Sequence, residues 1–323
     1  MENKEPLVSI ISGYYNRENL VDHSIKSLIN QTYKNTEIIV FDDCSTDNTY
    51  NELKKYTHIE RLKLIRHDVN KGFVQGLIDA IKIAKGEYIA IHGSGDISFK
   101  ERIEKQVSYL NSNKNVSVVG CYYHNSKNGE IVNTYKNPSN KDFYKTVTSR
   151  SVFSHGEVMF RKSIYEKVGG YRTFFTFAQD RDLWCRMSLI SDYYVIKEVL
   201  YERCNDAQNA VKNNIMKLAK QTLLSDFAIQ SIKMRKEVGF DFIDIVGNQA
   251  LAYRKKTANV SNRIAHLAFK EYKLKNWDNF NKLYSLLKCE RNTIRKLLII
   301  LVKTKIINIA FLAVLSKSKK SVF

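Results

Sequence analysis

Two short apolar runs near the N-terminus, LVSIIS (7–12) and EIIVF (37–41), decide the fold. Both are rich in β-branched residues, which is typical of strands that are buried on both faces of a sheet. Between them, apolar residues recur close to helical spacing. These residues are Leu20, Val21, Ile25, Leu28 and Ile29. A strand, a helix and a second strand therefore follow one another along the chain.

The same alternation continues downstream. The next expected elements are a helix that runs through Leu53, a strand over 62–65, a helix over 77–84 and a strand over 88–91. This order predicts an α/β fold with a mostly parallel sheet, helices on both faces, and ligand-binding loops at the carboxyl ends of the strands. The loops after Ile11, Phe41 and Ile91 are therefore the expected location of the chemistry.

Beyond residue 100 the pattern is less regular. Residues 103–110 and 116–120 predict one more helix and one more strand, whereas the polar stretch 125–150 predicts a flexible loop over the site. Long helical periodicities without proline follow. We therefore divide the chain into an α/β domain over 1–205 and a helical, basic C-terminal region over 206–323.

The net charge of +19 is concentrated in the C-terminal part of the chain. Residues 1–200 hold 28 Lys and Arg against 24 Asp and Glu, whereas residues 201–323 hold 24 against 9. A basic excess attracts polyanions, so nucleic acid and anionic lipid are both candidate partners on charge alone. The region contains neither a recognised nucleic-acid module nor a repeated basic-aromatic platform, which argues against nucleic acid.

Two apolar runs in the same region, LLIILV (297–302) and IINIAFLAVL (306–315), favour lipid instead. Neither run reaches the roughly 20 residues that span a bilayer, and lysines interrupt and follow them. An apolar helix flanked by lysines suits the surface of an anionic membrane. The alternative is that Leu297–Leu315 packs on the helical region as ordinary core.

The cysteines and the N-terminus indicate a cellular compartment. Five cysteines stand far apart without a C-x-x-C pair, so neither a disulfide framework nor a zinc site is expected. The N-terminus lacks the basic and apolar segments of a secretory signal. We therefore expect a cytoplasmic protein, peripheral at the inner face of the cell membrane.

Three segments of the chain resemble the family 2 glycosyltransferases of the GT-A fold, a Rossmann-like architecture. The segments are SIISGYYNR (9–17) with VFDDCSTDNT (40–49), AKGEYIAI (84–91) with Asp96 and RIEKQ (102–106), and VGGY (168–171) with QDRDLWCR (179–186). Together they span residues 6 to about 190. The resemblance implies transfer of a sugar from a nucleotide diphosphate.

The resemblance places the nucleotide against residues that follow the strand ends. A base needs an apolar surface and an acceptor for its N–H, which Tyr15 and Asp43 can supply, and Gly13 allows close backbone approach. For Asp43 the alternative is a turn or capping role, and for Lys71 it is an ordinary solvated lysine. The implied nucleotide-binding residues are Gly13, Tyr15, Asn16, Asp43, Lys71 and Ser94.

Sugar transfer also requires a base that takes the proton of the acceptor hydroxyl. The resemblance gives this role to Asp180, and a carboxylate on the far side of the sugar leads to inversion at the anomeric carbon. The alternative is that Asp180 pairs with Arg181 or caps the following helix. His155 and Trp184 are candidates for the acceptor pocket, with a structural histidine and a core tryptophan as the alternatives.

The metal-binding motif of the family is degenerate in this chain. Members carry DxD or DxDD after the fourth strand, whereas the chain has GSGD (93–96). Asp96, with His92, could hold Mg²⁺ or Mn²⁺ weakly. Alternatively, the glycines bring backbone amides to the phosphates, or Lys71 and the lysines of the C-terminal region supply the positive charge.

Two functional hypotheses follow. The leading one is an inverting glycosyltransferase that moves a sugar from a nucleotide-diphosphate donor, a UDP-sugar, to a glycan or lipid-linked acceptor in cell-surface polysaccharide synthesis. The rival, motivated by Gly93 and Gly95, is a non-catalytic or very slow nucleotide-sugar-binding protein.

Overall fold

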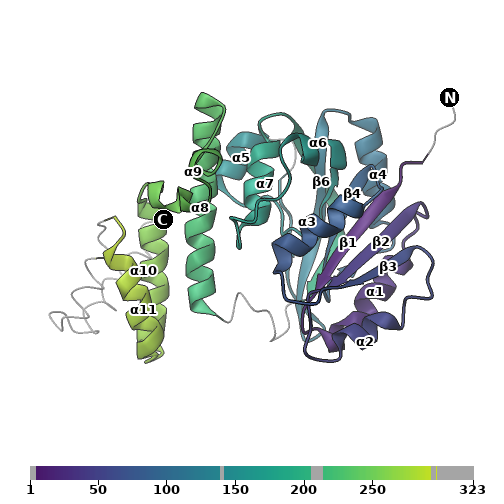
Figure 1. Ribbon diagram of the computed structural model, residues 1–323, viewed down its shortest axis with the longest axis horizontal. Coiled ribbons are helices and arrows are strands. Elements are labelled where there is room, and N and C mark those ends of the chain that lie inside the picture. The colour runs from purple at the N-terminus through teal and green to yellow at the C-terminus, as the bar shows by residue number, and fades with distance from the viewer. Residues whose placement is uncertain (1–4, 139–141, 205–213, 292–295, 297–323) are drawn as a thin grey trace. The chain divides into compact units, whose positions relative to one another are not determined.

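The computed structural model describes residues 5–138, 142–204, 214–291 and 296. The chain divides into two compact units. Unit 1 consists of Met1–Gln208 and Ser231–Asp241, and unit 2 of Asn209–Gln230 and Phe242–Phe323. All strands of the described residues belong to unit 1 (Figure 1).

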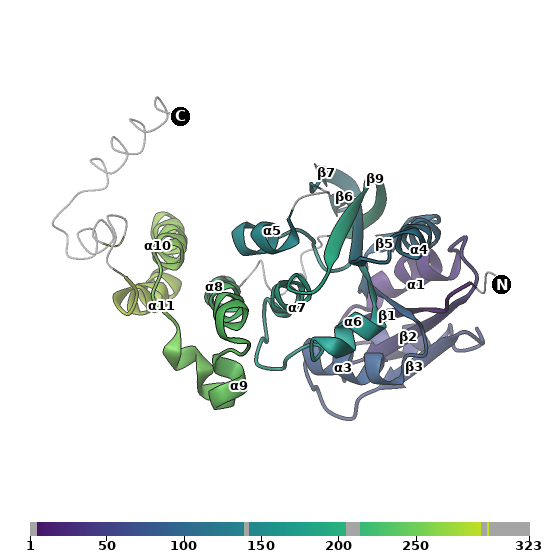
Figure 2. The ribbon, with the colours of Figure 1, turned by 90° about the horizontal axis from the view of Figure 1, so that it is seen from above.

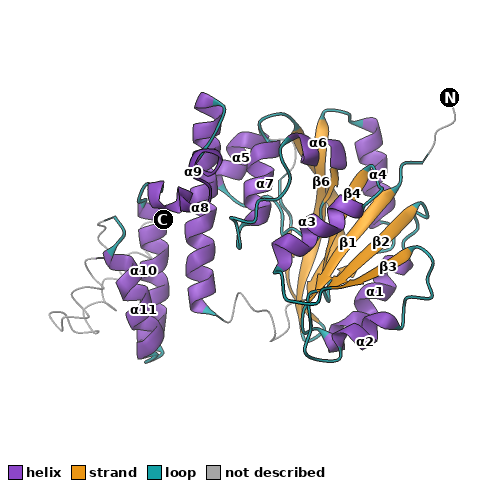
Figure 3. Cartoon of the chain, viewed as in Figure 1, coloured by secondary structure: helices purple, strands orange, loops and turns teal. Residues whose placement is uncertain are grey.

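The sheet of unit 1 contains four adjacent parallel strands, as the sequence predicts (Figure 3). Their spatial order is β3 (Leu62–Arg66), β2 (Thr36–Asp42), β1 (Val8–Tyr14) and β4 (Tyr88–Gly93). Gly13 of β1 lies in register with Phe41 and Gly93 on the two neighbouring strands. The loops that follow β1, β2 and β4 therefore leave the sheet at the same edge.

The remaining strands make the sheet mixed. β8 (Met159–Arg161) is antiparallel to β4 and to β6 (Val116–Lys127), and β6 is parallel to β9 (Asp192–Cys204). The short β5 (Ile97–Ser98) pairs with the end of β9, and β7 (Glu130–Tyr135) pairs with the end of β6. The predicted α/β class is confirmed.

Helices cover both faces of the sheet (Figure 2). Since successive side chains of a strand point to opposite faces, Ile10 and Ile11 belong to different cores. The core around Ile10 is completed by α1 (Val21–Ile29), α2 (Thr49–Lys54) and α4 (Arg102–Ser112). The core around Ile11 is completed by α3 (Phe73–Ile83), α5 (Phe143–Ser149), α6 (Lys162–Lys167) and α7 (Gln179–Met187).

The stretch 125–150 is not the flexible loop predicted from its polar composition. β6 continues to Lys127, β7 follows, and α5 begins after Asp142, whose side chain accepts a hydrogen bond from the Lys145 amide at 2.9 Å. The side chains of β7 are exposed along its whole length. The prediction was wrong because a strand without a buried face has the composition of a loop.

The described residues of unit 2 are helical. Its elements are the first part of α8 (Ile215–Val238), α9 (Phe242–Val246), the 3₁₀ helix η2 (Gly247–Tyr253), α10 (Ala258–Lys273) and α11 (Trp277–Lys288). Ile264 and Leu283 lie at the centre of its core. The last turns of α8 belong to unit 1, where Ile232 joins the core around Ile11. The segment Ser231–Asp241 thus packs with the sheet although it lies beyond residue 205.

The predicted membrane-associating segment Leu297–Leu315 lies outside the described residues. Among the residues that the structure describes, no helix combines the length and the apolar character needed to cross a bilayer.

Candidate functional site

The carboxylate of Asp43 organises the loop between β3 and α3. It follows β2, is almost completely buried, and accepts hydrogen bonds from His67 Nδ1 (2.8 Å) and from the amides of Lys71 (2.8 Å) and Gly72 (2.9 Å). Gly72 has a φ of 84°, which favours glycine. Asp43 therefore fixes the point at which Phe73 begins α3. These contacts match the turn alternative, and base binding by Asp43 stays a prediction.

Tyr15 and Asn16 lie in the loop that follows β1. The Asn16 side chain accepts a hydrogen bond from the Thr46 amide (2.9 Å), and the Asn16 amide donates one to Ser45 Oγ (3.0 Å). Asn16 thus joins the loops after β1 and β2. The ring of Tyr15 is 47% exposed beside them. Its role as the aromatic surface for a nucleotide base stays a prediction.

The structure gives Gly13 a packing role that the sequence did not indicate. A Cβ atom at this position would lie 2.2 Å from Phe41 Cζ, and one at Gly76 would lie 2.2 Å from Phe41 Cε2. The ring of Phe41 thus fits between two glycines, one on β1 and one on α3. Lys71 is half exposed, and its ammonium lies 3.0 Å from Asp79 Oδ2.

Asp96 is buried in the loop after β4, and both of its oxygens are engaged. Oδ2 accepts a hydrogen bond from the Tyr201 hydroxyl (2.6 Å), and Oδ1 accepts one from the Cys204 amide (2.9 Å). Burial raises the pKa of Asp96 to about 6, against the effect of the Tyr201 hydrogen bond. His92 is also buried, with Nε2 3.0 Å from Ser24 Oγ. Sequence reasoning did not find Tyr201, which lies in no motif.

The two predicted metal ligands, Asp96 and His92, are buried and hydrogen-bonded to protein groups. Asp96 and His92 point into the protein, and the described residues contain no group of three His, Cys, Asp or Glu side chains arranged for a metal. The alternative that backbone amides of this stretch bind the phosphates also fails at two positions. The Gly93 amide donates to the Tyr201 hydroxyl (2.9 Å), and the Gly95 amide donates to Ser24 Oγ (3.2 Å). Ser94 lies between these two glycines, and its nucleotide role stays a prediction.

Restoring a carboxylate at Gly93 is expected to destabilise the fold. A Cβ atom there would lie 2.2 Å from Asp96 Oδ2, so Gly93→Asp forces two acidic side chains together. We expect a loss of about 2–4 kcal/mol in the free energy of unfolding, measured by urea denaturation, and no gain in Mn²⁺ affinity. Asn133→Asp is the control, because it adds a carboxylate at an exposed position of β7. Wild-type stability combined with tight Mn²⁺ binding would contradict this account.

His155 is a residue predicted to line the acceptor pocket, and that role stays a prediction. This residue has a φ of 87°, is 8% exposed, and its Nε2 lies 2.7 Å from the Tyr171 hydroxyl. Its ring meets Phe73 edge-on, with centroids 5.9 Å apart. Burial lowers the pKa of His155, and the nearby carboxylate of Asp180 partly opposes this shift. His155 therefore lies between the start of α3 and Asp180.

Asp180 is in the first turn of α7, where the positive end of the helix dipole stabilises a carboxylate. Arg181 is not its partner, because no ion pair joins the two in the described residues and Arg181 donates to the Val147 carbonyl (2.9 Å). The N-cap of α7 is Ala178, with a φ of 59°, so Asp180 is not the cap either. Among the described residues, Asp180 thus neither pairs with Arg181 nor caps α7, the two structural alternatives considered for it.

Trp184, one turn later, is a core residue, which was the structural alternative to a place in the acceptor pocket. It is 3% exposed and packs against Phe153 and Phe160, with ring centroids 5.7 and 5.8 Å apart. Its face is covered by these rings, so the indole is not positioned to stack on an acceptor sugar.

These features define a class of protein. Loops from the ends of β1, β2 and β4 leave the α/β sheet at one edge, which is where sheets of this kind bind their ligands. A family model described as glycosyl transferase family 2 matches residues 9–169. EpsE of Bacillus subtilis (strain 168), a candidate glycosyltransferase by its description, is 35% identical over 193 residues, which are 57% of this chain and 67% of EpsE. The chain belongs to glycosyl transferase family 2.

Other relatives and solved structures agree with this assignment. The Escherichia coli UDP-Glc:alpha-D-GlcNAc-diphosphoundecaprenol beta-1,3-glucosyltransferase WfgD is 35% identical over 139 residues, 43% of this chain and 54% of that protein. The E. coli O-antigen biosynthesis glycosyltransferase WbnJ is 31% identical over 186 residues, 56% of this chain and 71% of WbnJ.

Two solved structures share the fold at low sequence identity. TarS of S. aureus in complex with UDP-GlcNAc superposes with a TM-score of 0.56 at 15% identity, over 88% of this chain and 93% of that one. Mannosyltransferase PcManGT from Pyrobaculum calidifontis in complex with GDP-Man and Mn²⁺ gives 0.55 at 16% identity, over 87% and 85%. The GT-A fold implied by the sequence is confirmed.

Proposed function

We propose that the chain is an inverting glycosyltransferase that moves a sugar from a UDP-sugar to a glycan or lipid-linked acceptor in cell-surface polysaccharide synthesis. One observation carries the proposal. The loop held by Asp43 continues into Phe73, Phe73 contacts His155, and His155 contacts Tyr171 beside Asp180. The nucleotide side and the acceptor side are thus joined by direct contacts within one unit.

The reaction places Asp180 opposite the leaving diphosphate. The carboxylate takes the proton of the acceptor hydroxyl, the acceptor oxygen bonds to the anomeric carbon, and the bond from that carbon to the phosphate oxygen breaks. UDP leaves with the electron pair, and the configuration inverts. Burial raises the pKa of Tyr171 and lowers that of His155, so both neighbours of Asp180 stay neutral near pH 7.

The donor and the acceptor are proposed from the relatives. TarS binds UDP-GlcNAc, and the name of WfgD gives UDP-glucose as donor and a diphosphoundecaprenol-linked sugar as acceptor. A lipid-linked acceptor fits a peripheral position at the inner face of the cell membrane, where the basic excess of residues 201–323 would meet anionic lipid. Lys71 is the proposed counter-charge for the diphosphate, because its half-exposed ammonium extends from the loop that Asp43 holds.

A nucleotide screen tests this function. Thermal unfolding of the full chain is measured with UDP, GDP, dTDP and their sugars, with EDTA and with Mn²⁺, and release of UDP from UDP-sugars is followed in parallel. We expect UDP to raise the melting temperature, since a ligand at about 100 times its Kd adds about 2.7 kcal/mol of stability. EDTA is expected to leave this shift unchanged. A chain indifferent to every nucleotide refutes the proposal, and UDP binding without turnover favours the non-catalytic alternative.

A further inference from the structure

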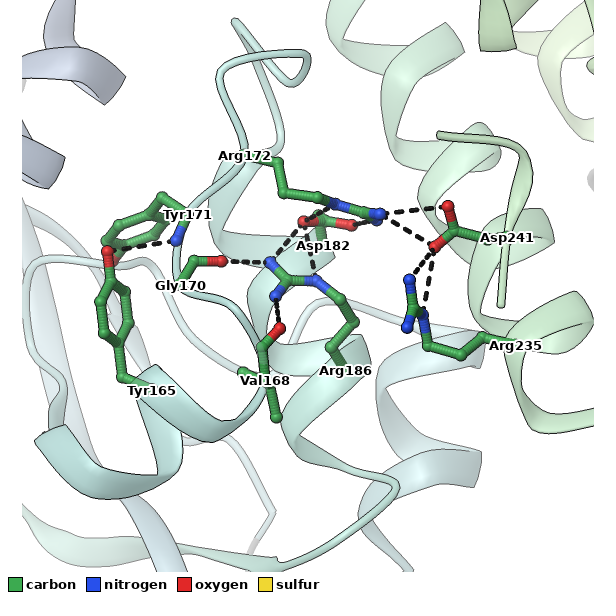
Figure 4. Close-up of polar contacts among 9 residues, drawn as sticks. All are labelled: Tyr165, Val168, Gly170, Tyr171, Arg172, Asp182, Arg186, Arg235 and Asp241. Atoms are coloured by element: carbon green, nitrogen blue, oxygen red, sulfur yellow. Dashed lines mark hydrogen bonds and ion pairs between the residues drawn. The ribbon is translucent and has the colours of Figure 1, made fainter. Parts of the chain in front are cut away.

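Five charged side chains form an alternating ladder beside the proposed catalytic helix (Figure 4). Asp182 accepts hydrogen bonds from Arg186 (2.7 and 3.2 Å) and from Arg172. Arg172 also donates to both oxygens of Asp241 (2.9 and 3.1 Å), and Asp241 is bound on its other side by Arg235 (3.1 and 3.2 Å). We call Arg186, Asp182, Arg172, Asp241 and Arg235 the charge ladder.

The inner members of the charge ladder are buried. Asp182 and Asp241 are almost completely buried, and the Arg172 side chain is 14% exposed. Burial alone would raise the pKa of Asp182, but Arg186 and Arg172 together hold it below its usual value. Burial alone would lower the pKa of Arg172, but Asp182 and Asp241 together raise it. Removing any inner member would therefore leave a buried charge without its partner.

The charge ladder fixes the surroundings of Asp180 from two directions. Asp182 lies in the same first turn of α7, whose N-cap provides no side-chain hydrogen bond. Arg186 also donates to the carbonyls of Val168 (2.5 Å) and Gly170 (2.6 Å), which tie down the loop that carries Tyr171. The orientation of this turn and the position of Tyr171 thus depend on the same set of ion pairs.

Asp241 enters this arrangement from a distant part of the sequence. It lies 69 residues after Arg172, and every member of the charge ladder lies beyond the family match at residues 9–169. It nevertheless belongs to the same compact unit as the sheet, together with Arg235. The segment that follows the core residue Ile232 therefore completes the environment of α7.

We propose that Asp241 is a positioning residue for sugar transfer, which acts through Arg172 and Asp182 on the orientation of Asp180. This inference rests on the proposed function. Asp241 touches neither donor nor acceptor in this scheme. Its loss is expected to misplace the base while the nucleotide loops around Asp43 keep their geometry.

The test compares Asp241→Asn with a matched variant of unit 2. Asp226→Asn removes a carboxylate from another buried cluster, in which Asp226 lies 3.6 Å from Arg254 and accepts from Thr257 Oγ1 (2.9 Å). We expect Asp241→Asn to lower kcat for UDP-sugar turnover about 10- to 100-fold with an unchanged Kd for UDP, and Asp226→Asn to change neither. Arg172→Lys keeps the charge but loses the fork that bridges two carboxylates, and is expected to reproduce the kcat loss if Asp241→Asn does not fold.

A double variant separates positioning from a general structural defect. In an Asp180→Asn background, Asp241→Asn is expected to cause no further loss of residual turnover, because its effect passes through Asp180. The same fractional loss in both backgrounds overturns the inference, and so does an unchanged kcat in the single variants of Asp241 and Arg172. A wild-type chain that binds UDP but turns over no donor instead overturns the proposed function, and this inference with it.

Discussion

Asp180→Asn is expected to lower kcat for sugar transfer by about 100- to 10,000-fold, the usual contribution of a general base. The amide keeps the size of the side chain and its place in the first turn of α7, but it cannot take the proton of the acceptor hydroxyl. The residues proposed to bind the nucleotide lie on other elements. The Kd for UDP is therefore expected to stay within about twofold of wild type, which is the signature of an interaction used in the transition state.

Asp192→Asn is a suitable control for this prediction. It makes the same charge change on an exposed residue at the start of β9, where the carboxylate accepts a hydrogen bond from Asn115 (2.9 Å). Wild-type turnover is expected from it. If Asp180→Asn also turns over at the wild-type rate, the base is another residue and the proposed mechanism is wrong.

Asp43→Asn is expected to have the opposite signature. The substitution replaces one of two oxygens that together accept hydrogen bonds from His67, Lys71 and Gly72. An amide N–H then faces a buried donor, which costs about 2–4 kcal/mol of stability. The loop before α3 loses its anchor, so UDP affinity is expected to fall at least about tenfold, which corresponds to 1.4 kcal/mol. Calorimetric titration and urea denaturation measure the two effects.

Asp47→Asn separates the two effects of Asp43→Asn. Asp47 lies in the same acidic loop, but its carboxylate accepts hydrogen bonds from the amide and the hydroxyl of Thr49 at the start of α2 (3.0 and 2.5 Å). Loss of these hydrogen bonds is expected to cost about 1 kcal/mol of stability. UDP affinity should not change. An equal loss of affinity in both variants would mean that Asp43 acts through stability alone.

The sequence predicts the first half of the fold because its strands are buried on both faces. The runs at 7–12 and 37–41 are almost entirely apolar and rich in β-branched residues, a pattern typical of a strand that is buried on both faces. β7 was missed for the converse reason, because an exposed edge strand buries no face and leaves no apolar alternation. α5 was missed with it, because only Phe143, Thr146 and Val147 of this short helix are buried.

The site is predictable only where its residues lie in local motifs. Asp43 and Asp180 follow recognisable patterns, and the structure joins their surroundings through Phe73 and His155. Tyr201 and Asp241 could not be found this way, because each meets its partner across a long stretch of chain. Their contacts are set by tertiary packing, and neither lies in a pattern of neighbouring residues.

The most direct test of this account is calorimetric titration of UDP into the wild-type chain, Asp180→Asn and Asp43→Asn. We predict the same affinity for the first two and at least about tenfold weaker binding for the third. That result would separate a nucleotide-binding half, organised by Asp43, from a catalytic half that carries Asp180. A parallel loss of affinity in both variants, or no UDP binding by the wild-type chain, would contradict it.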